Sequence, residues 1–223
     1  DAEAVRDERM RFDDTGQQFV QKVAFHAPVA GPGRLRGIQV EPGADAEIPV
    51  MILAVQPGAA RAGGSYASSL AGQLEGIENG CDQAVFLDSS TQTYIEELGG
   101  MNLFFVTRDN HLVTPELTGS ILEGITRGSI LELATSLGLT PEERRIPIQE
   151  WKDGVASGEI SEVFACGTAA VITPVGELRW EGGSAPSTAG EGGGEVTKAI
   201  RTALLDIQYG RVEDTHGWMT RLA

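Results

Sequence analysis

The sequence predicts a mixed α+β fold, in which strands and helices follow one another without clean alternation. Short apolar runs separated by Gly, Pro and Asp clusters, such as residues 50–53, are typical of strands joined by turns. Apolar residues that recur at spacings of three and four, as in 66–79 and 126–137, are typical of amphipathic helices. With 223 residues, of which 41% are hydrophobic, the chain is long enough to bury a sizeable core.

The expected elements follow from these patterns along the chain. Residues 19–53 are expected to be β-rich, and a helix is expected at 66–79 before Gly80. The remaining expectations are strands at 84–87 and 101–106, a hairpin return at 111–113 after Asp109-Asn110, a helix at 126–137, a strand at 145–148, a short helix near Trp151, strands at 163–166 and 170–175, and a helix at 196–207. The Gly-, Ser-, Ala- and Pro-rich stretch 182–194 predicts a flexible surface loop.

The charge balance limits the partners of this chain. Asp and Glu number 32 against 17 Lys and Arg, so a net charge of −15 is expected to repel nucleic acid and anionic membranes. No apolar run approaches the ~18 residues that a membrane span needs, and a cytoplasmic location is expected. Cys81 and Cys166 have no Cys or His at ligand spacing, so no metal site is expected.

Four motifs and a C-terminal run stand out after residue 60. They are Gly63-Gly64-Ser65-Tyr66, residues 94–104, Gly124-Ile125-Thr126-Arg127, residues 162–170, and residues 213–219. In this order and at these separations they resemble the motifs of branched-chain amino acid aminotransferases, which belong to pyridoxal phosphate fold type IV. One such motif alone would be weak, but four in order make a chance similarity improbable.

The resemblance implies a fold and a domain organisation. It covers about residues 55–223 and implies the large cofactor-binding domain of a D-amino acid aminotransferase-like fold of type IV, with a mixed sheet or pseudo-barrel. Residues 1–54 are expected to form a divergent β-rich segment, and the motifs of the family's smaller N-terminal domain are not found there. Family members pair as homodimers, so a homodimer is expected.

The resemblance also implies pyridoxal 5′-phosphate as cofactor. It assigns cofactor contacts to Tyr66, Glu97, Ile125, Thr126, Gly167 and Thr168, and substrate contacts to Thr168 and Ala169. The cofactor withdraws electrons well only while its ring nitrogen is protonated, which requires a nearby carboxylate, and Glu97 matches the family residue in that role. The amides and hydroxyl of Ile125 and Thr126, at an expected helix start, suit its phosphate.

These residues also have purely structural interpretations. Glu96 and Glu97 can be solvated charges at a strand end, and Thr126 can be only a helix N-cap. Tyr66 near a helix start can serve packing alone. A Gly-Thr turn at 167–168 has no meaning without its flanking residues, so these roles depend on the whole set of motifs.

Arg61 is the main departure from the family pattern. It stands where the family carries the lysine that attaches the cofactor covalently and moves the substrate α-proton. A guanidinium does not replace that amine, because its pKa stays above ~12 and its lone pairs are delocalised. Lys22, Lys152 and Lys198 are expected to be solvated charges that offer no substitute. Covalent cofactor attachment is therefore not expected.

At family level, the resemblance implies amino-group exchange between leucine, isoleucine or valine and 2-oxoglutarate, with amino acids and 2-oxo acids as ligands. Because of Arg61, the activity of this chain is expected to be very low or absent. The alternative is a non-catalytic relative, which binds the cofactor noncovalently or pairs with an intact aminotransferase.

Overall fold

The computed structural model describes residues 48–54, 72–186 and 192–220, with backbone only for 48–54. The strands are β1 (Ile48–Ala54), β2 (Gln83–Leu87), β3 (Ile95–Leu98), β4 (Asn102–Thr107), β5 (His111–Pro115), β6 (Thr140–Arg144), β7 (Ile160–Gly167), β8 (Val171–Trp180) and β9 (Gly183–Pro186). The helices are α2 (Ile125–Ala134), α3 (Ile148–Ser157) and α4 (Glu195–Gln208), with a 3₁₀ turn at Thr135–Leu137 and helical residues at 72–78. Arg61 and Tyr66 lie outside the described residues.

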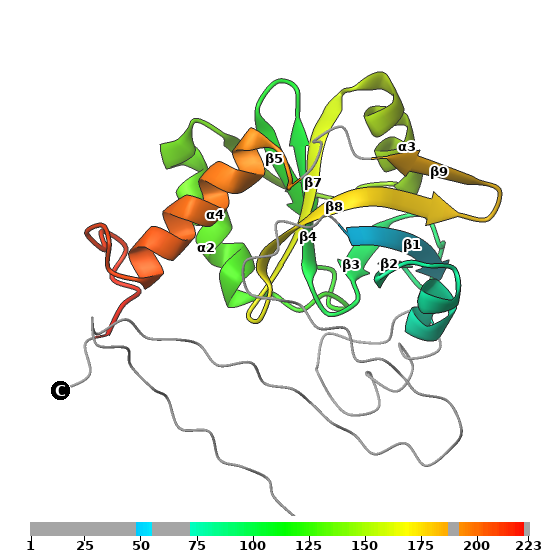
Figure 1. Ribbon diagram of the computed structural model, residues 1–223, viewed down its shortest axis with the longest axis horizontal. Helices are drawn as coiled ribbons and strands as arrows, with labels where there is room; N and C mark the ends of the chain where they lie inside the picture. Colours follow the sequence, from blue (N-terminus) through cyan, green and yellow to red (C-terminus); the bar gives the residue numbers. More distant parts are fainter. Residues whose placement is uncertain (1–47, 55–71, 187–191, 221–223) are drawn as a thin grey trace, which may run out of the picture. The chain divides into compact units, whose positions relative to one another are not determined.

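The described strands form one mixed sheet in the order β3-β2-β1-β8-β7-β4-β5-β6, with β9 paired to β8 (Figure 1). Strand β1 is parallel to both of its neighbours, β5 is parallel to β6, and the other pairs are antiparallel. The two ends of the sheet approach each other, since Tyr94 and Pro147 form an isolated bridge and Ile95 N donates to Ile146 O at 2.9 Å. The mixed α+β fold is confirmed, as a curved open sheet rather than a closed barrel.

Side-chain alternation along β4 divides the core between the two faces of the sheet. Phe105 packs edge-on against Trp151 of α3, with ring centroids 5.1 Å apart, in one buried cluster. Its neighbour Phe104 stacks on Phe164 at 5.2 Å, in a second cluster that includes Ile130 of α2 and Ile200 of α4. Since successive strand residues point to opposite faces, α3 covers one face and the α2–α4 pair covers the other.

Most of the elements expected from the sequence are present. Strands β2, β4, β7 and β8, the β4–β5 hairpin and helices α2, α3 and α4 confirm the predictions for those segments. The helix predicted at 66–79 is confirmed over 72–78, and its first residues lie outside the described part of the chain. Residues 183–186, predicted to be loop, form β9, because β8 runs on to Trp180 and offers them a partner.

The strand predicted at 145–148 is wrong, because the strand is β6 at Thr140–Arg144. That sequence, Thr-Pro-Glu-Glu-Arg, has no apolar residue by which to recognise it. Strand β6 is the last in the sheet order, and an edge strand tolerates both a proline and a row of charges.

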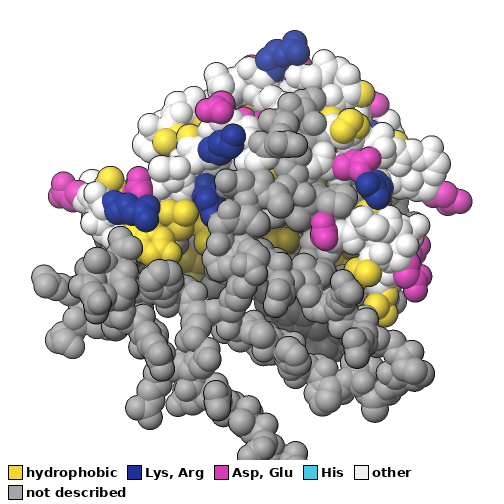
Figure 2. All heavy atoms as spheres, in the orientation of Figure 1, with side chains coloured by type: hydrophobic (Ala, Val, Ile, Leu, Met, Phe, Trp, Pro, Cys, Tyr) yellow, Lys and Arg dark blue, Asp and Glu magenta, His cyan; other side chains and the backbone are white. Residues whose placement is uncertain are grey.

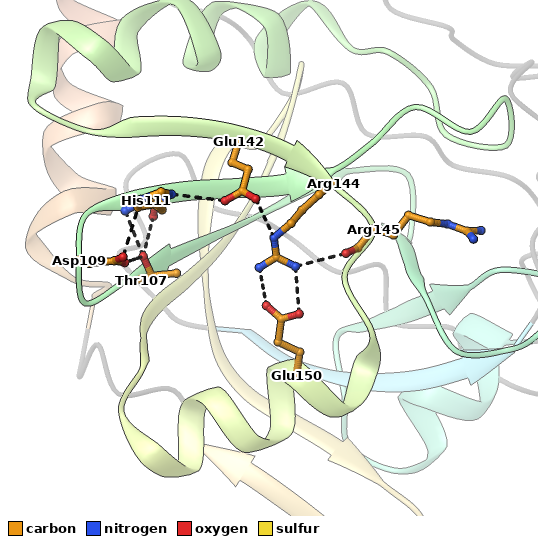
Figure 3. Close-up of polar contacts among 7 residues, drawn as sticks. All are labelled: Thr107, Asp109, His111, Glu142, Arg144, Arg145 and Glu150. Carbon is orange, nitrogen blue, oxygen red and sulfur yellow. Dashed lines mark hydrogen bonds and ion pairs between the residues drawn. The ribbon is translucent and has the colours of Figure 1, made fainter.

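Ion pairs hold β6 on both of its faces. Arg144 Nε lies 3.1 Å from Glu142, and its two Nη atoms lie 2.5 and 2.9 Å from the carboxylate of Glu150 at the start of α3 (Figure 3). Glu142 in turn contacts His111 Nδ1 of β5 at 3.3 Å. Glu143, between them, pairs at 2.5 Å with Arg127 of α2. A polar edge strand is thereby joined to two helices.

The described surface carries charges of both signs. On the face drawn in Figure 2, acidic and basic side chains are interspersed rather than gathered into one patch. Among the described residues, no helix is both long and apolar enough to span a membrane.

Candidate active site

Glu97 is a buried carboxylate that holds the loop before α2. It lies on β3 with 5% of its surface exposed, and its Oε1 accepts a hydrogen bond from Leu122 N at 2.7 Å. The adjacent Glu96 is equally buried and accepts from the Ser120 hydroxyl. The interpretation of these two glutamates as solvated strand-end charges is therefore wrong, because β3 lies against this loop.

Asn102 holds the same loop from β4. Its Nδ2 donates to Leu122 O at 2.9 Å, so the N–H and the C=O of Leu122 are both bound by buried side chains. Gly124 comes so close that an added Cβ would lie 2.3 Å from Asn102 Oδ1, and its φ of +71° disfavours any other residue. Asn102 therefore fixes the point at which the loop ends and α2 begins.

Helix α2 begins immediately after this glycine with an open N-terminus. Its N-cap is Gly124, no side chain of the described residues caps it, and no acidic residue lies in its first turn. The interpretation of Thr126 as the N-cap is therefore wrong. Ile125, the first helical residue, is 92% exposed. Free backbone N–H groups at the positive end of a helix are suited to a bound anion such as a phosphate.

The predicted turn at 167–168 lies next to these elements. Gly167 pairs with Val171 across a short turn in which Thr168 and Ala169 are exposed. Cys166, which precedes the turn on β7, pairs with Asn102 on β4. Val171 has a φ of +55°, which is strained for a β-branched residue and is a common feature of functional sites.

Three of the predicted contact groups thus lie near one another, where β3 and β7 end and β4 begins. Strand register and the loop before α2 bring together Glu97, the start of α2 and the turn after β7. The motif resemblance implies no role for Asn102 or Arg127, although both lie within the quoted motifs. The burial of Asn102 against Gly124 is a tertiary contact that local sequence patterns do not signal.

The described residues offer little for other kinds of chemistry. Burial raises the pKa of the Cys166 thiol to about 12, against a smaller lowering effect of the Arg127 charge, so Cys166 is not a nucleophile. The described residues contain no group of three or more His, Cys, Asp or Glu side chains placed to hold a metal ion.

The chain matches the family described as Amino-transferase class IV over residues 48–178. This chain belongs to the class IV aminotransferase family. It is 58% identical over 168 residues to the branched-chain-amino-acid aminotransferase of Mycobacterium tuberculosis, a match that covers 74% of this chain and 45% of that protein. The chain therefore spans about half the length of such class IV relatives.

Solved structures of class IV aminotransferases have the same fold. The Escherichia coli branched-chain amino acid aminotransferase has a TM-score of 0.66 at 36% identity, covering 79% of this chain and 58% of that one. The Thermobaculum terrenum enzyme, solved in its PLP-form, has a TM-score of 0.66 at 30% identity, covering 79% and 55%. The fold expected from the sequence motifs is confirmed.

Proposed function

We propose that this chain is a branched-chain-amino-acid aminotransferase-like protein that binds pyridoxal 5′-phosphate without the covalent attachment of its relatives. The observation that carries the proposal is the buried Glu97 carboxylate, joined through Leu122 to the open N-terminus of α2. A carboxylate and a helix start suit the two charged ends of this cofactor, its ring nitrogen and its phosphate.

Each proposed contact has a physical task. Glu97 holds a proton on the ring nitrogen, and Tyr66 binds the ring oxygen. The backbone of Ile125, Thr126, Gly167 and Thr168 binds the phosphate, and Thr168 and Ala169 bind the substrate carboxylate. When bound, the cofactor supplies an electron-withdrawing ring that eases loss of the substrate α-proton.

Arg61 decides how much of the family reaction remains. The family-level reaction moves an amino group between leucine, isoleucine or valine and 2-oxoglutarate. Arg61 neither attaches the cofactor nor accepts the α-proton at neutral pH, because a guanidinium stays protonated. We therefore expect noncovalent binding of the cofactor and very low or no transamination.

The same substitution favours a second candidate function. A class IV relative without the covalent step can act as a noncovalent cofactor-binding module or as the partner of an intact aminotransferase in a dimer. Mixed dimers with an intact aminotransferase from the same cell, resolved by native mass spectrometry, would support this function. Strictly self-associated chains would count against the partner role.

Replacement of Arg61 tests the main proposal. The purified chain and the Arg61→Lys variant are dialysed with pyridoxal 5′-phosphate, reduced with borohydride and analysed by mass spectrometry. We expect the cofactor mass to be retained only in the variant, on the peptide that contains position 61. Equilibrium dialysis without reduction should show binding to both proteins. Absence of binding to both would contradict the site, and leucine turnover by the unmodified chain would contradict the inert assignment.

A further inference from the structure

Arg127 is a buried cation in the first turn of α2. Its side chain is 3% exposed, and Nη2 donates to Pro115 O at 3.0 Å and pairs with Glu143 Oε2 at 2.5 Å. Pro115 is the last residue of β5, where the chain enters the loop that leads to α2. The guanidinium thus joins the first turn of the helix to the beginning of the loop that precedes it.

The same loop is held at its other end by β3 and β4. Leu122 is bound by Glu97 and Asn102, and Gly124 packs against Asn102. Within the part of the chain that the structure describes, the side chain of Arg127 makes the polar contacts that join the first turn of α2 to both β5 and β6. Without it, the turn that carries Ile125 and Thr126 would lose its polar link to β5 and β6, and the Gly124 backbone would still join it to the loop that Glu97 and Asn102 hold.

The charge of Arg127 is unusual for this position. A cation in the first turn lies at the positive end of the helix dipole, where acidic residues are the favourable choice, and α2 has none there. Its Nε has no hydrogen-bond partner among the described residues. Within the described segments, the charge of Arg127 is paired with Glu143, which is half-exposed on β6, and a bound anion beside α2 would further compensate this positive charge.

We propose that Arg127 is a positioning residue for the cofactor phosphate: by joining α2 to Pro115 and Glu143, it orients the N–H groups of Ile125 and Thr126 toward that phosphate. This inference rests on the proposed binding of pyridoxal 5′-phosphate and deepens it. It predicts that Arg127 contributes to the affinity for the phosphate group of the cofactor and not to the affinity for its ring.

The test separates the phosphate from the ring of the cofactor. Dissociation constants of pyridoxal 5′-phosphate, pyridoxal and inorganic phosphate are measured by equilibrium dialysis for the full chain, Arg127→Met and Arg127→Lys. Arg144→Met is the matched control, since it removes an arginine whose ion pairs hold the opposite face of β6 (Figure 3). Circular dichroism and melting temperature report folding of each variant.

We expect Arg127→Met to weaken binding of pyridoxal 5′-phosphate about tenfold or more and to leave pyridoxal binding unchanged. Arg127→Lys keeps the charge without the planar fork, so a smaller loss is expected. Arg144→Met should bind both compounds as the unmodified chain does. If Arg127→Met does not fold, Arg127→Lys carries the same comparison.

If the Arg127 variants lost equal affinity for pyridoxal 5′-phosphate and for pyridoxal, the role of Arg127 would be purely structural and the inference would be overturned. Unchanged pyridoxal 5′-phosphate binding in the folded variants would overturn it as well, with the proposed function left intact. Absence of cofactor binding to the unmodified chain and to Arg61→Lys would instead overturn the proposed function itself, and this inference with it.

Discussion

Glu97 Oε1 accepts a hydrogen bond from Leu122 N at 2.7 Å, which joins a buried carboxylate of β3 to the loop that ends at the start of α2. The same peptide group is bound on its carbonyl side by Asn102. Leu122 therefore links Glu97, at the ring end of the proposed site, to the start of α2, at its phosphate end. A ligand that contacts both ends would bind groups that the same loop holds in place.

Glu97→Gln tests the charge at the ring end. The amide oxygen can still accept from Leu122 N, so we expect folding to be retained, but a neutral amide no longer favours a protonated ring nitrogen. Cofactor affinity should fall by about tenfold, measured by equilibrium dialysis. Glu96→Gln is the matched control, because the neighbouring carboxylate is equally buried and bonds to Ser120 instead. Equal losses in the two variants would contradict the assignment of Glu97.

Gly124→Ala and Gly128→Ala form a second matched pair, four residues apart. An alanine at 124 meets Asn102 Oδ1 and requires a left-handed φ, so we expect destabilisation by about 1–3 kcal/mol. Gly128 is helical with nothing within 4 Å of an added Cβ, so alanine there should stabilise by about 0.5–1 kcal/mol. Urea unfolding measures both. Stabilisation by Gly124→Ala would show that the loop does not hold this conformation.

Asp88 is expected to make the fold sensitive to acid. Burial opposes its ionisation, but hydrogen bonds from Tyr94 N, the Ser90 hydroxyl, Thr93 N and Thr91 N outweigh burial and lower the pKa of Asp88 well below its usual range. A lowered folded-state pKa contributes stability above the unfolded value of about 3.9, and this contribution is lost as the pH falls below it.

Asp88→Asn should therefore cost about 2 kcal/mol at pH 7, and the difference from the unmodified chain should shrink below about pH 4. Burial raises the pKa of Asp82, the opposite direction, so its ionised form disfavours folding at neutral pH. Asp82→Asn should be neutral or slightly stabilising at pH 7. Chemical unfolding at pH 3, 5 and 7 compares the three proteins, and a penalty for Asp88→Asn that does not change with pH would contradict the ionic role.

The two cysteines should resist thiol reagents in the folded chain. Burial raises the pKa of Cys166 to about 12 and also raises that of Cys81, where the Arg179 charge acts in the other direction. Both thiols therefore remain protonated at pH 8. We expect 5,5′-dithiobis(2-nitrobenzoate) to react at least about a hundred times more slowly with the native chain than with the urea-unfolded chain. Fast labelling of native Cys166 would show that β7 is not buried at this point.

The sequence predicted those elements whose own residues show an apolar run or a helical spacing of apolar residues. Strand β4 shows its apolar run, and α4 shows apolar residues at helical spacing before Gly210, whose φ is +65°. Strand β6 carries no such signal, because its charged residues are stabilised by His111, Arg127 and Glu150, which lie elsewhere in the chain. Strand β9 depends in the same way on the extension of β8.

The candidate site likewise has features that were readable from the sequence and features that needed the structure. Its residue types and their order were readable as motifs, and the position of Arg61 among them is the basis of the proposal that the cofactor is bound noncovalently. The assignments of Tyr66 and Arg61 stay predictions, since both lie outside the described residues, and so does the domain boundary at residue 54. That Glu97 is buried and that α2 has an open start were not readable from the motifs.

The sequence by itself determined the family and the mixed fold, and it supplied the prediction about Arg61, because each depends on residue identity and local spacing. Only the tertiary structure decided that Glu97, Asn102 and Arg127 act on one loop, since they are brought together by strand register and helix packing rather than by spacing along the chain. The physical reason is burial, because a polar side chain removed from water needs a hydrogen-bond partner, and the fold can supply that partner from a distant part of the chain.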